Sequence, residues 1–151
     1  MMIGVDDYVP RRGVRRHNVW VANIIEDHPF HERARNKLNQ LVSDGEILHL
    51  SRQIVREVVS VCTLGRNLSH ALSWPELRPH LDAVISQTVL LEDHGGSIRK
   101  LIDLAAQHAV LGKQIHDTNI VATMLTHGIT RLVTFNPDDF KRFAEIEIIV
   151  P

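Results

Sequence analysis

Short apolar segments alternate along this chain with longer segments in which apolar residues recur every three or four positions. The short segments are residues 47–50, 88–91, 131–134 and 146–150, and their Ile, Leu and Val content is typical of buried strands. The longer segments predict helices over about 30–43, from 52 onward, 74–86, 97–109 and 115–127, with a short one at 137–143. This order favours an α/β fold with a central parallel sheet of about four to five strands flanked by helices.

Local signals set the expected ends of several helices. Ser51 is a good N-cap, and Ser73 with Glu76 has the spacing of a capping box. Gly128 is a typical residue just after a helix C-terminus. We expect the pair at 95–96 (Gly-Gly) to break the chain before the next helix starts.

The size and composition of the chain indicate one ordinary globular domain. Its 151 residues are 44% apolar and 23% charged, and the formal net charge of −1 neither indicates nor excludes nucleic-acid binding. Cys62, the one cysteine, excludes an intramolecular disulfide, and we expect it to be a buried thiol in a helix. No apolar run approaches the ~18 residues that span a bilayer, and no secretory signal is visible, so we expect a cytoplasmic location.

The first 16 residues differ from the rest of the chain. Residues 2–5 have the composition of a short strand that would end at Asp6 and Asp7, and a basic stretch with Pro and Gly follows at 10–16. We therefore predict an atypical N-terminal arm over 1–16 and one folded domain over 17–151.

Acidic and amide side chains follow several of the predicted strands. Glu57 borders the apolar stripe of the helix after strand 47–50, and Asp117 lies in the first turn of helix 115–127. Asn136, Asp138 and Asp139 follow the strand ending at 134. Sites in parallel sheets form where the strands end, so these side chains are expected to converge, and oxygen ligands without thiolate favour Mg²⁺ or Mn²⁺.

Each of these residues also has an ordinary structural interpretation. Glu57 alone fits a half-exposed helix position, and Asp117 alone fits a partner of the helix dipole. Asp138 and Asp139 fit an N-terminal cap. A pair of histidines, His28 and His31, is interpreted as helix-entry and surface residues, because no second pair of zinc-type ligands lies at a suitable spacing.

Four segments of the sequence resemble the motifs of one protein family. Residues 113–122 (KQIHDTNIVA) resemble the H-D-x-x-I-V-A helix start of PIN domains, and residues 132–140 (LVTFNPDDF) resemble their L-V-T-x-[DN]-x-x-D-F segment. Residues 56–58 (REV) fit their second motif, and 18–21 (NVWV) resemble the region after their first motif. The resemblance covers about residues 16–151 and is closest to the VapC-like toxin ribonucleases of toxin–antitoxin pairs.

This resemblance implies a PIN-like three-layer fold and a Mg²⁺- or Mn²⁺-dependent endoribonuclease. It implies an RNA substrate, a homodimer and a small antitoxin as partner. The catalytic residues that it implies are Glu57, Asp117, Asn136 and Asp139. The implied metal ligands are Glu57, Asp117 and Asp139, with Asp6 or Asp7 as a candidate replacement for the family's first aspartate. Thr134, Asn18 and Lys113 are implied to orient the ligands by hydrogen bonds or to contact phosphate. Other candidate phosphate contacts are Arg52, Arg56, Gln114, Arg131 and Lys141.

The chain departs from the family pattern at the first motif, where D-T-N-V becomes R-H-N-V at 16–19. Arg16 stands where the family has a metal-binding aspartate, and arginine repels a cation. Three alternatives stay open. Asp6 or Asp7 supplies the missing carboxylate, Arg16 itself pairs with Asp117 and Glu57 in a site without metal, or the first 16 residues are an altered N-terminus. The alternative function is therefore a catalytically impaired PIN-like protein that acts as a protein-binding or dimerisation module. A receiver-domain interpretation of the Asp6–Asp7 pair is disfavoured because the middle strand ends without an acid.

Overall fold

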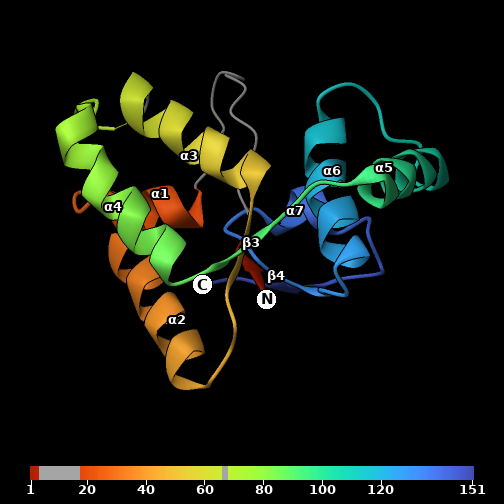
Figure 1. Ribbon diagram of the computed structural model, residues 1–151, viewed down its shortest axis with the longest axis horizontal. Coiled ribbons are helices and arrows are strands. Elements are labelled where there is room, and N and C mark those ends of the chain that lie inside the picture. The colour runs from red at the N-terminus through yellow and green to blue at the C-terminus, as the bar shows by residue number, and fades with distance from the viewer. Residues whose placement is uncertain (4–17, 66–67) are drawn as a thin grey trace.

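The computed structural model describes residues 1–3, 18–65 and 68–151, which form a five-stranded parallel sheet with helices on both sides (Figure 1). The strand order is β3-β2-β1-β4-β5. The strands are β1 Met2–Ile3, β2 His49–Ser51, β3 Val89–Leu91, β4 Arg131–Val133 and β5 Glu147–Ile149. The predicted α/β class and strand count are confirmed.

Seven helices in the described residues cover this sheet. They are α1 Val19–Ile24, α2 His31–Ser43, α3 Arg52–Leu64, α4 Trp74–Ser86, α5 Gly95–Gln107, α6 Gln114–Thr126 and α7 Pro137–Phe140. Figure 1 shows α1 to α4 gathered on one side of the strands and α5 to α7 on the other, which is the three-layer arrangement. Because helices cover both faces, the central strands are the most deeply buried: Met2, Ile3 and Leu132 are fully buried, whereas the edge strands β3 and β5 carry exposed residues.

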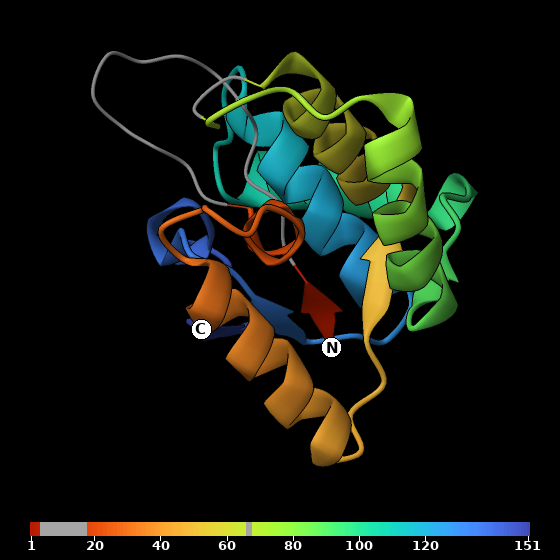
Figure 2. The same ribbon diagram turned by 90° about the vertical axis from the view of Figure 1, so that its left-hand side faces the viewer.

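The central strand is built from the first residues of the chain. Met2 and Ile3 are fully buried, and β1 pairs in parallel with β2 on one side and β4 on the other (Figure 2). Residues 1–3 of the predicted arm are therefore part of the sheet. Residues 4–16 of that arm lie outside the described residues, so the predicted boundary between the arm and the domain at residue 16 stays a prediction.

Some of the helix ends predicted from local sequence signals are confirmed, and others are wrong. Ser51 Oγ accepts a hydrogen bond from the Ile54 backbone N–H (3.3 Å), and the predicted capping box at Ser73 is present. The expected chain break at 95–96 is wrong, because α5 begins at Gly95 and the His94 ring caps it by accepting from Gly96 N–H (3.1 Å). Helix α7 ends at Phe140, so the predicted helix end at residue 143 is wrong.

Cys62 is buried in α3, as expected, and burial raises the pKa of its thiol to about 11. A thiol with this pKa is protonated at neutral pH and therefore a poor nucleophile. Among the helices described, none is both long and apolar enough to cross a bilayer.

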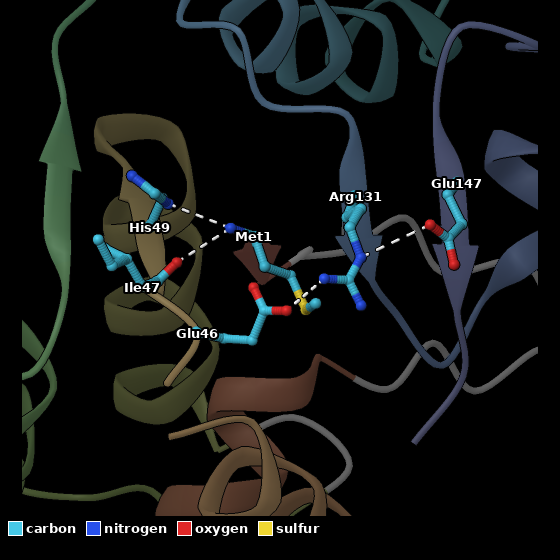
Figure 3. A network of polar contacts seen from close by, with 6 residues as sticks. All are labelled: Met1, Glu46, Ile47, His49, Arg131 and Glu147. Carbon is cyan, nitrogen blue, oxygen red and sulfur yellow. Dashed lines mark hydrogen bonds and ion pairs between the residues drawn. The ribbon is translucent and has the colours of Figure 1, made fainter. Parts of the chain in front are cut away.

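A polar network surrounds the start of β1 at the amino ends of the central strands (Figure 3). The Met1 amino group donates to Ile47 O (2.9 Å) and lies 3.3 Å from His49 Nδ1. Arg131 pairs with Glu46 and, at 3.5 Å, with Glu147. Arg131 begins β4 in this network and pairs with two carboxylates. Its predicted contact with phosphate stays a prediction.

The pKa of His49 in this network is lowered by burial and then by the positive Met1 amino group. In the folded protein His49 therefore binds fewer protons than in the unfolded chain at pH values below about 6.5. The free energy of unfolding should accordingly fall as the pH drops through this range. We expect His49→Asn to make that fall smaller, whereas His80→Asn on the exposed side of α4 should leave it unchanged. Urea unfolding at pH 7 and at pH 5 measures how much free energy of unfolding is lost between the two pH values. An equal loss in the wild type and in His49→Asn would contradict the prediction.

Candidate functional site

The strand order places a candidate site at the carboxyl ends of β1 and β4. The chain crosses from β1 to β2 and β3 on one side of the sheet and from β3 to β4 and β5 on the other. In open α/β sheets, ligands bind outside the carboxyl ends of the two strands where this order reverses. The segment after β4 and the helices that border this edge therefore define the site.

Gln53 joins two of the helices at the site. Its side-chain Nε2 donates to Glu57 Oε1 (2.8 Å), one turn further along α3, and to the backbone oxygen of His116 in α6 (3.1 Å). Its Oε1 accepts from Asn119 Nδ2 (2.8 Å), also in α6. Gln53 is only 6% exposed. Exchanging its Nε2 and Oε1 would place oxygen against oxygen and nitrogen against nitrogen, so only one orientation of the amide makes these three hydrogen bonds.

Asp117 lies next to His116 in the first turn of α6 and is 3% exposed. The positive end of the helix dipole favours an anion at this position. A carboxylate is seldom buried without a function or a compensating charge, because its desolvation is costly. Gln53 thus links the Glu57 carboxylate to the helix start that carries Asp117, and the structure brings these two predicted residues to the same α3–α6 junction.

The segment after β4 supplies the third part of the site. Thr134 is fully buried, and its Oγ1 accepts from the Asn136 backbone N–H (3.0 Å), which fixes the turn into α7. Asp139 is half-buried in the first turn of α7, a helix that packs against α6. Asn136 Nδ2 is buried without a hydrogen-bond partner in the part of the chain that the structure describes.

Asn18 and Lys113 occupy the starts of two helices. The Asn18 side chain caps α1, since its Oδ1 accepts from the backbone N–H groups of Trp20 (2.8 Å) and Val21 (3.3 Å). Lys113 is exposed immediately before α6. Their predicted contacts with phosphate or with a second shell stay predictions.

The other residues predicted to contact phosphate differ in the partners of their side chains. Arg52 pairs with Glu92 (3.4 Å), and Lys141 pairs with Asp138 (3.0 Å). Gln114 accepts from Arg142 Nη1 (2.9 Å). Arg56 is exposed and directly precedes Glu57 in α3.

The chemistry of the acids fits a hard divalent cation, but the described residues do not complete its coordination. Carboxylate and amide oxygens are ligands that Mg²⁺ and Mn²⁺ prefer. Over residues 1–3, 18–65 and 68–151, no group of three His, Cys, Asp or Glu side chains lies close enough together to hold an ion. Asp6, Asp7 and Arg16 all lie outside these residues. The roles assigned to Glu57, Asp117, Asn136 and Asp139 therefore stay predictions.

A cavity of about 450 Å³ opens beside Glu57 between α3, α5 and α6. Its apolar surface comes from Leu101 and Ile115. Its polar lining comes from Gln53, Arg56, Glu57, Ser60, His116 and Asn119. The cavity extends the junction into a space that a small molecule or part of a polymer can enter.

The Gln53 contacts should also stabilise the fold. We expect Gln53→Leu to lower the free energy of unfolding by about 1–3 kcal/mol, because it leaves the polar groups of Glu57 and Asn119 without their buried partner. Gln40→Leu on the exposed surface of α2 is the matched control and should change it by less than about 0.5 kcal/mol. Chemical denaturation measures both, and equal effects would show that the Gln53 contacts do not hold the junction together.

Comparison with known proteins agrees with this architecture. The family model of the PIN domain matches residues 17–146. The fold is similar to a chain in the crystal structure of VapBC2 from Rickettsia felis bound to a DNA fragment from their promoter. The TM-score is 0.65 at 18% identity, over 89% of this chain and 94% of that chain. No curated protein matches the sequence. Because the family model covers most of the chain, this protein belongs to the PIN-domain family.

Proposed function

We propose that this protein is a metal-dependent endoribonuclease of the toxin–antitoxin type that cleaves RNA phosphodiester bonds. The observation that carries the proposal is the α3–α6 junction, where Gln53 links the Glu57 carboxylate to the helix start holding the buried Asp117. Membership of the PIN family supports the nuclease class.

In this proposal Glu57 and Asp117 would hold Mg²⁺ or Mn²⁺ together with further carboxylates from Asp139 and from Asp6 or Asp7. Asp139 would have to move closer to the other two, because the described carboxylates do not form a group of three. Such an ion, when bound beside a phosphodiester, supplies a nucleophile at neutral pH and neutralises charge on the reacting phosphate. Gln53 holds the Glu57 carboxylate in place, and the buried Thr134 fixes the turn that carries Asn136. Lys113 and Arg56 are proposed to contact RNA phosphates.

An RNA cleavage assay tests this proposal. Purified protein is incubated with a 5′-labelled single-stranded RNA in Mn²⁺, in Mg²⁺ and in excess chelator, and the products are resolved by length. We expect discrete internal cuts with either ion and none in chelator. Uncut RNA under all three conditions, with folded protein, would reject the nuclease.

The alternative is a PIN-like protein whose site has lost its chemistry and which binds a protein partner. The feature that favours it is Arg16, which stands in the sequence where the PIN motif that residues 16–19 resemble has an aspartate. In the cleavage assay this alternative predicts intact RNA. The variant Arg16→Asp would then restore cutting if Arg16 alone disables the site.

A homodimer and an antitoxin-like partner belong to the same proposal. Ile98 and Ile102 lie one turn apart on α5 and are 60% and 62% exposed, which supports a protein interface on this helix. The similar structure is that of a VapBC2 assembly. Sedimentation velocity of the purified chain tests the homodimer directly.

A further inference from the structure

The cavity beside Glu57 carries polar groups that the fold itself does not use. Among the described residues, Arg56 forms no ion pair, and the Ser60 hydroxyl takes part in no hydrogen bond. Leu101 and Ile115 provide a half-buried apolar surface between these groups. An apolar surface with a few available polar groups is the usual composition of a ligand pocket.

Asn119 gives this pocket a directional hydrogen-bonding group. Its Nδ2 donates to Gln53 Oε1 (2.8 Å), and Gln53 is itself fixed by two further hydrogen bonds. The orientation of the Asn119 amide is therefore set. Its Oδ1 accepts no hydrogen bond from the residues that the structure describes, and Asn119 belongs to the pocket lining. A ligand that fits this group must present an N–H or O–H donor.

The charges of the lining limit where an anion can lie. The Glu57 carboxylate repels an anion at its own end of the pocket, whereas Arg56 attracts one. The matching ligand has a flat, uncharged part with a hydrogen-bond donor on its edge and a negative group attached to it. A nucleotide has this combination, because its base is flat, uncharged and carries N–H donors on its edge, and its phosphate is negatively charged.

We propose that this pocket binds one nucleobase of the RNA substrate. The base packs on Leu101 and Ile115, a base N–H donates to Asn119 Oδ1, and the adjoining phosphate pairs with Arg56. This inference rests on the proposed ribonuclease function, which it extends by assigning a base-binding subsite next to Glu57.

A nuclear magnetic resonance titration tests the subsite without any need for cleavage. ¹⁵N-labelled protein is titrated with adenosine 5′-monophosphate and, separately, with ribose 5-phosphate, which lacks the base. We expect the first to shift the backbone amides of Leu101 and Ile115 and the side-chain amide of Asn119 in a saturable way. Ribose 5-phosphate should bind at least about five-fold more weakly, because it makes no contact with the apolar surface.

Two variants on the same helix sharpen the test. Leu101→Glu should abolish the response to adenosine 5′-monophosphate, whereas Ala106→Glu, at an exposed position of α5 outside the pocket, should keep it. Equal affinity for the two ligands, shifts confined to another surface, or an unchanged Leu101→Glu response would overturn the subsite.

The failure of this inference differs from the failure of the proposed function. Protein that cuts RNA but shows no nucleotide response in the pocket overturns the subsite alone. Protein that binds adenosine 5′-monophosphate there but leaves RNA intact supports the subsite and rejects the nuclease.

Discussion

Asp117→Asn should reduce the rate of RNA cleavage at least about 100-fold, which is the usual loss when one preorganised group that stabilises charge is removed. The substitution keeps the size and shape of the side chain and removes its charge. Since Asp117 is 3% exposed at the start of α6, its charge acts at short range with little screening by water. Gel-based cleavage of a labelled RNA under single-turnover conditions measures the rate.

The effect of Asp117→Asn must be separated from a loss of folding. We expect its Tm to lie within about 4 °C of the wild type, because the amide keeps the size and shape of the carboxylate and still lies at the start of α6. Asp82→Asn, at an exposed position of α4, is the matched control and should cut RNA at the wild-type rate. Cleavage by Asp117→Asn within a few fold of wild type would remove Asp117 from the catalytic site.

Ile3→Ala should lower the free energy of unfolding by about 2–5 kcal/mol, the usual cost of truncating a fully buried aliphatic side chain. Ile3 is fully buried in β1, between the two neighbouring strands at the centre of the sheet. Ile47→Ala, where the wild-type side chain is 63% exposed, should change stability by less than about 0.5 kcal/mol. Urea unfolding followed by circular dichroism measures both. Similar losses for the two variants would mean that the first residues are not the centre of the sheet.

Patterns within single segments predicted most of the architecture. The recurrence of apolar residues every three or four positions predicted the helices, since it follows directly from helix geometry. The caps at Ser51 and Ser73 were predictable for the same reason, because a cap involves residues only two or three positions apart.

Features that depend on contacts between distant parts of the chain could not be predicted from single segments. The composition of residues 2–5 predicted a short strand, but the central place of β1 depends on pairing with strands far along the sequence. Arg131 looked available for phosphate, but Glu46 and Glu147 meet it only after the sheet has formed. The start of α5 was missed for a local reason, because the His94 ring caps a helix whose first two residues are glycines.

In the candidate site, too, residues within one motif were predictable and contacts between helices were not. The motifs identified Glu57 and Asp117, which the structure places at one junction. Gln53 and Asn119 were missed, although Gln53 lies four residues before Glu57 and so shares its helix face. The contact between Gln53 and Asn119 spans 66 positions and exists only because α3 and α6 meet.

Titration calorimetry with Mn²⁺ is the most direct test of the central claim, that Glu57 and Asp117 belong to one site for a divalent cation. We predict that the wild-type protein releases or absorbs heat in a saturable titration. Glu57→Gln and Asp117→Asn should each weaken Mn²⁺ binding at least about ten-fold, whereas Asp82→Asn should not. Equal binding by the wild type and both site variants, or no binding by any of them, would contradict the claim.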